Sequence, residues 1–137
     1  GLRLVHGSTV ATNAALEGKG VRTVLLANRG FADLLSIGRQ NRRELYELMP
    51  SVPSAPVPPE LCLEVEGRLG SDGRLLDTLD ATQIERLRQR LLELAPQAVA
   101  VNLLFSYLDP TLEERIAAVM PAGVFVSLSS RVLPEIR

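Results

Sequence analysis

Residues 80–104 read DATQIERLRQRLLELAPQAVAVNLL, and the change of pattern within this stretch decides the fold. Asp80 and Gln83 stand three positions apart, as in the capping box that begins many helices. The apolar residues before Pro96 form one stripe at helical spacing: Ile84, Leu87, Leu91 and Leu92. From Ala98 the chain becomes continuously apolar and rich in valine, which is typical of a strand buried in a sheet. The stretch therefore predicts a helix followed by a buried strand.

The segment on the C-terminal side repeats this alternation. Asp109-Pro110 is a helix start with proline at the first helical position, and an amphipathic pattern runs from there to Met120. Val124 to Leu128 then reads as a strand. Because a strand, helix and strand within one sheet form a parallel crossover, residues 80–129 are predicted to be a helix-strand-helix-strand unit of an α/β fold.

On the N-terminal side, Val21 to Asn28 is a second buried strand, and Phe31 to Ile37 is a short helix. Residues 39–60 are first cationic and then proline-rich, which predicts a long excursion without regular structure. Residues 61–79 alternate and then turn at Ser71-Asp72-Gly73, which predicts a hairpin. We expect residues 1–137 to form one α/β domain fragment with a mixed, partly parallel sheet and flanking helices.

Composition excludes several classes of function. Fifteen basic and sixteen acidic residues give a net charge of −1 over 137 residues, so we expect no nucleic acid partner. The apolar runs are far shorter than the roughly 20 residues that a membrane span needs, so we expect no membrane partner. Cys62 and His6 are the single cysteine and histidine, which predicts no disulfide framework, no metal-ligating cluster and a cytoplasmic location.

The first candidate site is the corner from His6 to Asn13, after the short apolar run that begins at Leu2. Gly7 lets a ligand approach the backbone, and the hydroxyls of Ser8 and Thr9 stand beside the free amides of a helix expected over Val10 to Leu16. Such a corner can hold an anion or a carbonyl oxygen. The alternative is that a hydroxyl only caps the helix and the histidine bonds to backbone.

The second candidate is the loop that follows Gly38, with the residues Arg39, Gln40, Asn41, Arg42 and Arg43. Guanidinium groups can form bidentate pairs with carboxylates, and the amides between them add directional donors and acceptors. A solvated basic loop remains the alternative.

Three further groups are read as structural: Glu113 and Glu114 complement the dipole of a helix N-terminus, and Cys62 is an inert thiol in a strand.

Three motifs in order along the chain resemble the N-terminal domain of the hydantoinase/oxoprolinase family. They are Val5-His6-Gly7-Ser8-Thr9-Val10-Ala11-Thr12-Asn13-Ala14, then Gly30-Phe31-Ala32-Asp33, then Ile37-Gly38-Arg39-Gln40-Asn41-Arg42. The resemblance continues through Asp72-Gly73-Arg74, Ala100 to Tyr107, Ser127 to Ser130 and Leu133 to Arg137. It covers nearly the whole chain.

The resemblance implies an actin-like fold, related to sugar kinases, in the A-type subunit or half of an ATP-dependent enzyme that opens cyclic amides. The substrate would be a lactam or hydantoin of the 5-oxoproline type, and ATP with Mg²⁺ would activate its amide oxygen. The resemblance also implies a B-type subunit or fused second half as partner, and a homo-oligomer is a further expectation. His6 would orient the loop or act as a proton relay, while Gly7, Ser8, Thr9, Asn13 and the Arg39 to Arg42 loop would bind substrate or cofactor.

This sequence departs from the family pattern at three places. The acidic, glycine-rich phosphate turn expected upstream of His6 is not present, so we expect a fragment that by itself is inactive and binds ATP weakly. Ser8 replaces the usual threonine, and Arg43 replaces the usual proline. Two alternatives to the hydrolase stay open: a ketone carboxylase subunit, and a structural or subunit-docking module that uses the proline-rich segment from Pro50 to Pro59.

Overall fold

The computed structural model describes residues 9–10, 13–14, 17–38, 46 and 55–136. Its strands are β1 (Thr23–Asn28), β2 (Cys62–Val65), β3 (Arg68–Leu69), β4 (Leu75–Asp77), β5 (Ala98–Asn102) and β6 (Phe125–Leu128). Its helices are α2 (Leu34–Ile37), α3 (Ala81–Leu94), α4 (Thr111–Ala118) and α5 (Ser129–Val132), with a 3₁₀ turn η1 (Pro59–Leu61) before β2.

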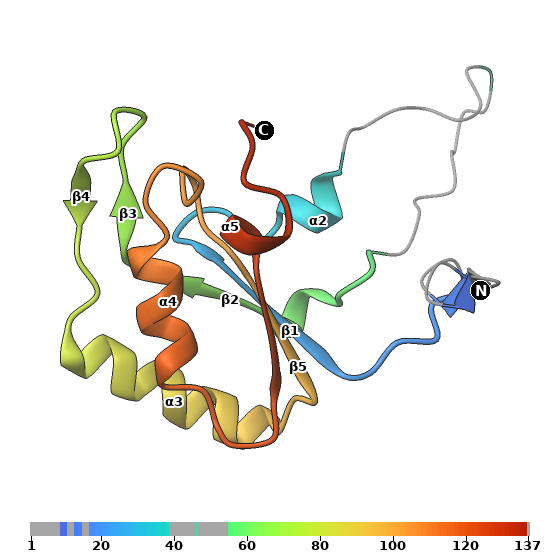
Figure 1. The fold of residues 1–137 in the computed structure, drawn as a ribbon. Helices are drawn as coiled ribbons and strands as arrows, with labels where there is room; N and C mark the ends of the chain where they lie inside the picture. Colours follow the sequence, from blue (N-terminus) through green and yellow to red (C-terminus); the bar gives the residue numbers. More distant parts are fainter. Residues whose placement is uncertain (1–8, 11–12, 15–16, 39–45, 47–54, 137) are drawn as a thin grey trace, which may run out of the picture.

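Four strands form one parallel sheet in the order β2-β1-β5-β6 (Figure 1). Strand β1 pairs in parallel with both β2 and β5, and β5 pairs in parallel with β6. The predicted α/β fold with parallel strands and flanking helices is therefore confirmed. The antiparallel pairing seen in the described residues lies outside this sheet, in the two-stranded hairpin of β3 and β4.

The order of the strands reverses beside β1. From β1 the chain adds β2 on one side, and it then crosses to the other side of β1 to add β5 and β6. In open parallel sheets, the loops after the strands on either side of such a reversal separate and leave a crevice at the carboxyl ends. This sheet therefore has its natural ligand position where β1 and β5 end.

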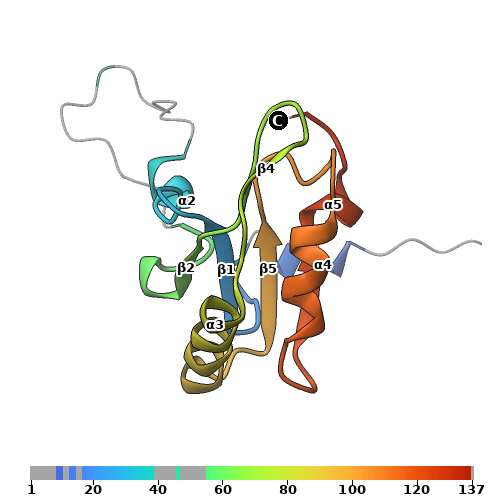
Figure 2. The same ribbon diagram turned by 90° about the vertical axis from the view of Figure 1, so that its left-hand side faces the viewer.

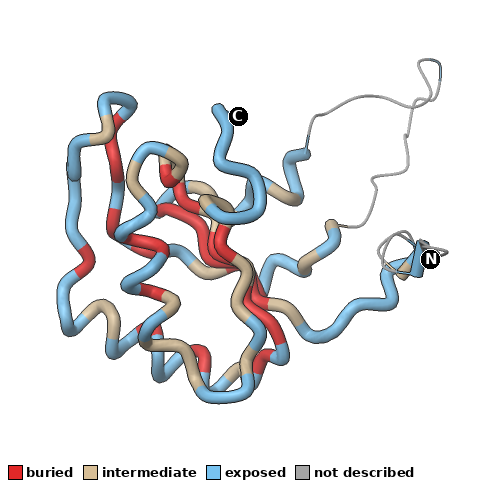
Figure 3. Tube along the Cα trace, in the orientation of Figure 1, coloured by how far each residue is buried: buried red, intermediate tan, exposed pale blue. Residues whose placement is uncertain are grey.

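Helices α3 and α4 cover the same face of the sheet (Figures 1 and 2). Leu91 of α3 and Ile116 of α4 are at most 1% exposed, and they pack in one cluster with alternate residues of the strands, including Leu26 and Val99. Because side chains alternate across a strand, these residues all lie on one face. Figure 3 shows the buried residues following the strands and the inner sides of the two helices.

Helix α3 begins as its sequence predicts. The Asp80 carboxylate accepts a hydrogen bond from the Gln83 backbone N–H at 2.7 Å, and the Gln83 side chain accepts one from the Asp80 N–H at 2.7 Å. This reciprocal pair satisfies two backbone donors that a helix start otherwise leaves free. It fixes where α3 starts and hence which of its residues face the sheet.

The segment expected to be a hairpin over residues 61–79 is arranged differently. Its first strand, Cys62–Val65, pairs with β1 and becomes an edge of the main sheet. The hairpin is restricted to β3 and β4, around a turn in which Gly73 takes a φ of 77°. Cys62 and Val65 are buried, so pairing with β1 removes more apolar surface from water than an isolated hairpin would.

Helix α2 is also shorter than the range predicted from Phe31. In the described part of the chain, no helix is long and apolar enough to cross a membrane.

Adjacent leucines of α3 provide a test of this packing. Leu91 is fully buried and Leu92 is 47% exposed. We predict that Leu91→Ala lowers the free energy of unfolding by about 2–5 kcal/mol, while Leu92→Ala lowers it by less than about 1 kcal/mol. Urea denaturation followed by circular dichroism measures both. Equal losses would contradict the face of α3 assigned to the core.

Candidate functional site

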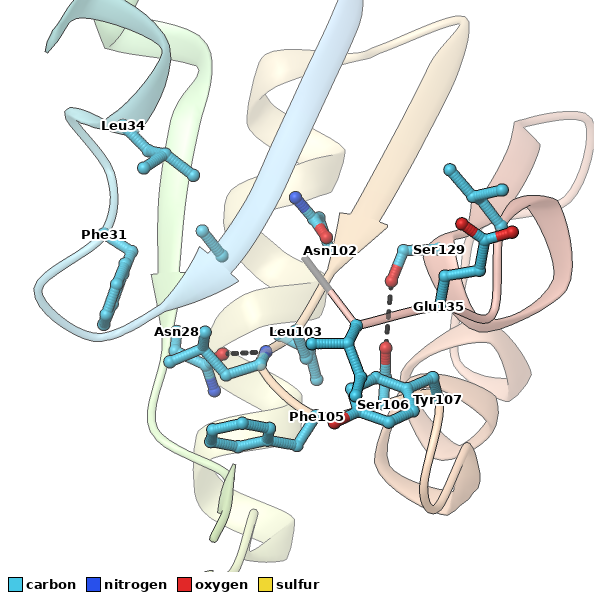
Figure 4. A pocket seen from close by; sticks show the side chains of 14 residues that line it. Asn28, Phe31, Leu34, Asn102, Leu103, Phe105, Ser106, Tyr107, Ser129 and Glu135 are labelled. Atoms are coloured by element: carbon cyan, nitrogen blue, oxygen red, sulfur yellow. Dashed lines mark hydrogen bonds between the residues drawn. The ribbon is translucent and has the colours of Figure 1, made fainter. Parts of the chain in front are cut away.

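A cavity of about 350 Å³ lies at the carboxyl ends of β1, β5 and β6 (Figure 4). Its volume is at the lower end of the roughly 300–1,000 Å³ found for small-molecule sites. Ala27 and Asn102, which are register partners on β1 and β5, contribute the sheet side of its wall. The cavity thus occupies the crevice that the reversal of strand order predicts.

The wall is mostly apolar, and it is built by the segments that leave the strands. The turn after β1 supplies Phe31 and Leu34, the loop after β5 supplies Leu104 and Phe105, and the segment from α5 onward supplies Leu133 and Ile136. Figure 4 shows Phe31 and Leu34 on one side and Glu135 on the other. An apolar enclosure with few polar groups is the usual composition of a site for a small organic molecule.

The turn that carries Phe31 depends on a glycine. The Phe31 N–H donates to the Asn28 carbonyl at 3.0 Å, and Gly30 has a φ of 84° at the third position of this turn. A positive φ at that position is cheap for glycine and costly for other residues. The Gly30 N–H also donates to the Glu64 carboxylate of β2 at 2.9 Å, which ties the turn to the neighbouring strand.

Asn28 joins two of the segments that follow strands of the sheet. Its side chain is 2% exposed, and its carboxamide donates to the Gly67 carbonyl at 2.6 Å and accepts from the Leu104 N–H at 2.6 Å. The first bond reaches the chain after β2, and the second reaches the chain after β5. A buried amide satisfied on both sides fixes the relative position of both segments.

Glu113 is another buried polar group beside Asn28. The sequence suggested only that it complements the dipole of a helix. Its side chain is fully buried, and Oε1 accepts from the Leu103 N–H at 3.1 Å and the Ser129 hydroxyl at 2.7 Å. Oε2 accepts from the Ser130 N–H at 2.9 Å and the Ser130 hydroxyl at 2.7 Å. One carboxylate of α4 therefore holds the loop after β5 and the start of α5 together.

The chain directly after these two anchored residues has a strained backbone. Phe105 has a φ of 60°, which an aromatic residue adopts at a cost of the order of 1–3 kcal/mol. Its ring meets that of Tyr107 edge-to-face, with centroids 6.5 Å apart. Such strain persists only where surrounding contacts impose it. Here the two residues before Phe105 are fixed, because the Leu103 N–H donates to Glu113 and the Leu104 N–H donates to Asn28.

The directions of the hydroxyl protons follow from this network. Each hydroxyl has a single proton. Ser129 donates its proton to Glu113, so the 2.9 Å contact between Ser106 and Ser129 must be a donation by Ser106. Both protons are then committed within the protein. The two hydroxyls can offer only lone pairs to a molecule in the cavity.

The charge of the cavity wall is unfavourable to a polyphosphate. Among the described residues that line it, Glu135 is the one charged side chain, and none is Lys, Arg or His. Phosphate sites use cationic side chains or free backbone amides. Groups of three or more His, Cys, Asp or Glu that could hold a metal ion are likewise not found in the described residues. These residues do not fit ATP or Mg²⁺ in this cavity.

Most of the site residues expected from the sequence lie outside the described residues. These are His6, Gly7, Ser8, Arg39, Gln40, Asn41 and Arg42. Thr9 and Asn13 are described and exposed, and the Asn13 N–H donates to the Thr9 carbonyl at 2.9 Å, one helical turn away. Their role in binding stays a prediction.

Sequence reasoning did not assign the cavity, although the family-like segments Ala100 to Tyr107 and Ser127 to Ser130 contribute to it. The available signal was Asn28 and Asn102, polar residues that each end an apolar strand at the same edge of a parallel sheet.

Cys62 is consistent with the inert thiol expected from the sequence. Its pKa is raised, mainly by burial and to a smaller extent by the charge of Glu60.

A parallel α/β sheet with a cavity at its reversal of strand order is the architecture of open α/β domains, which bind their ligands at this position. The chain matches the family model described as "Hydantoinase/oxoprolinase N-terminal region" over residues 2–122. It therefore belongs to the hydantoinase/oxoprolinase family.

Three relatives are longer proteins with a region similar to this chain. The chain is 33% identical to the caprolactamase subunit alpha of Pseudomonas jessenii, over 97% of this chain and 20% of that protein. It is 35% identical to 5-oxoprolinase 1 of Arabidopsis thaliana, over 96% of this chain and 12% of that protein. It is 28% identical to the acetophenone carboxylase gamma subunit of Aromatoleum aromaticum, over 84% of this chain and 17% of that protein. The chain spans about a fifth or less of these relatives.

Two solved structures have the same fold. The ATP-dependent caprolactamase from Pseudomonas jessenii has a TM-score of 0.78 at 33% identity, over 96% of this chain and 20% of that chain. The nucleotide-free acetone carboxylase has a TM-score of 0.80 at 21% identity, over 91% of this chain and 20% of that chain. At that lower identity the second match shows the fold alone.

Adjacent glutamates of α4 test the anchoring of the cavity wall. Glu114 is exposed and pairs with Arg131 at 3.1 Å, whereas Glu113 is buried among four donors. We predict that Glu113→Gln lowers the free energy of unfolding by about 2–4 kcal/mol, because an amide turns a donor toward other donors. Glu114→Gln should cost less than about 1 kcal/mol. Urea denaturation compares the two variants, and equal effects would contradict the anchoring role.

Proposed function

We propose that this chain is one part of an ATP-dependent hydrolase that opens cyclic amides of the lactam or hydantoin type. The observation that carries the proposal is its membership of the hydantoinase/oxoprolinase family, with a caprolactamase subunit and a 5-oxoprolinase among its relatives. The cavity supports it, because a mostly apolar enclosure of about 350 Å³ suits a small organic ring.

The proposal divides the work between two regions. The cavity at the carboxyl ends of β1 and β5 takes the organic substrate, since its one charged described residue is a carboxylate and would repel phosphates. ATP and Mg²⁺ bind elsewhere in the complete enzyme. The corner from His6 to Asn13 and the Arg39 to Arg42 loop are proposed to bind substrate or cofactor, as the sequence predicts.

Two further features belong to the same proposal. A partner subunit or fused second half completes the enzyme, which the relatives support because two of them are named as subunits. A cytoplasmic location is proposed from the use of a single cysteine in the sequence.

Thr9 tests the corner from His6 to Asn13. Its hydroxyl stands just before the helical turn that reaches Asn13, where a phosphate or carbonyl oxygen would meet free amides. We predict that Thr9→Ala in the complete enzyme lowers kcat/KM for the cyclic amide at least tenfold, or about 1.4 kcal/mol. The matched control Thr82→Ala, on the exposed side of α3, should change it less than twofold. Unchanged turnover of Thr9→Ala would remove this residue from the site.

A ketone carboxylase is the second candidate, favoured by the acetophenone carboxylase relative. Product analysis separates the two activities, because a carboxylase needs bicarbonate and a hydrolase needs only water. We predict that the complete enzyme consumes ATP with a cyclic amide at the same rate with and without bicarbonate. Carboxylated product from a ketone, formed only with bicarbonate, would replace the hydrolase proposal by the carboxylase.

A further inference from the structure

We propose that the cavity at the carboxyl ends of β1, β5 and β6 binds an uncharged cyclic amide by both the N–H and the carbonyl of its amide group. The ring N–H donates to the hydroxyl pair of Ser106 and Ser129, and the ring carbonyl accepts from the carboxamide of Asn102. This inference rests on the proposed function and names its substrate class: hydrocarbon lactams in preference to rings that carry a carboxylate.

The hydroxyl pair is the first element of the inference. Ser106 is 5% exposed and lines the cavity together with Ser129 (Figure 4). Both hydroxyl protons are used within the protein, in a chain that ends on the buried Glu113 carboxylate. A ligand that meets these oxygens must therefore bring a donor. A lactam N–H is such a donor, whereas a ketone or a carboxylate has none.

Asn102 is the second element. It ends β5 at the cavity, and its carboxamide makes no hydrogen bond to another described residue. By contrast, the Asn28 carboxamide is held by two bonds and has no comparable freedom. An unpaired carboxamide can donate to a carbonyl oxygen. In a lactam ring the N–H and the carbonyl are adjacent and fixed relative to each other. The serine oxygens can therefore accept from the N–H while the Asn102 carboxamide donates to the carbonyl.

The remaining wall defines what the rest of the ligand can be. Phe31, Leu34 and Phe105 offer apolar surface to ring carbons. Glu135 places a negative charge at the rim, which disfavours an anionic ligand. Because Glu135 is exposed, water and salt screen that charge and its effect is modest. The larger discrimination is expected against a ring without an N–H, because such a ring leaves the serine oxygens without a donor.

Two ligand pairs test the inference, with dissociation constants measured by calorimetry on the complete enzyme without ATP. Cycloheptanone replaces the N–H of ε-caprolactam by a methylene group, so we expect it to bind at least tenfold more weakly. 5-Oxoproline adds a carboxylate to pyrrolidone and keeps the ring N–H, so we expect it to bind about two- to fivefold more weakly, the modest effect of the exposed Glu135 charge. Equal binding within the caprolactam pair would overturn the role of the serine pair.

Single substitutions test which residue causes each difference in dissociation constant. Ser106→Ala should reduce the caprolactam-to-cycloheptanone ratio to within about threefold, whereas the exposed-serine control Ser71→Ala should leave it unchanged. Asn102→Leu should weaken both ligands at least fivefold. Glu135→Gln should strengthen 5-oxoproline about two- to fivefold and leave pyrrolidone unchanged. Variants that leave every constant unaltered would overturn the inference, and the wild-type ligand pairs test it even where a variant fails to fold.

Failure of this inference is distinguishable from failure of the proposed function. ATP-dependent hydrolysis of a lactam by the complete enzyme, with unaltered constants in all three variants, would overturn the cavity as the substrate site and leave the hydrolase proposal intact. Lactam binding in the cavity without any ATP-dependent hydrolysis would support the site and contradict the activity. The absence of any lactam binding would overturn the inference outright.

Discussion

The carboxylate of Glu113 is the interaction on which the rest of the site depends. It is fully buried and accepts four hydrogen bonds, from Leu103 after β5 and from Ser129 and Ser130 after β6. A buried charge that is satisfied in this way makes alternative arrangements of its donors costly, because each donor would lose a partner inside the protein. The loops after two neighbouring strands are thereby held in one geometry.

That geometry produces the chemistry of the cavity. The Glu113 carboxylate determines which way the Ser129 proton points, and Ser129 in turn determines the direction of the Ser106 proton. The strained backbone at Phe105 lies in the same loop, directly after the two residues whose N–H groups donate to Glu113 and Asn28. A residue of α4 that does not line the cavity therefore sets both the shape and the hydrogen-bonding character of its wall.

The regular elements could be predicted because their patterns are local. The apolar stripe and capping pair of α3 lie within residues 80–94, and the valine-rich run of β5 identifies a buried strand without reference to the rest of the chain. The partner of Cys62–Val65 could not be predicted, since a short alternating segment is compatible with either a hairpin or a sheet edge. Only the burial of Cys62 and Val65 against β1 decides between them.

The role of Glu113 was not readable either, because a glutamate in the first turn of a helix has a sufficient local explanation. Its donors lie 10 to 17 residues away and meet it only after the crossover between β5 and β6 has formed.

The most direct test of the account is a crystal structure of the complete enzyme with ε-caprolactam. We predict the lactam nitrogen within hydrogen-bonding distance of the Ser106 and Ser129 oxygens, and its carbonyl facing Asn102. A lactam bound at another place, with this cavity empty, would contradict the central claim.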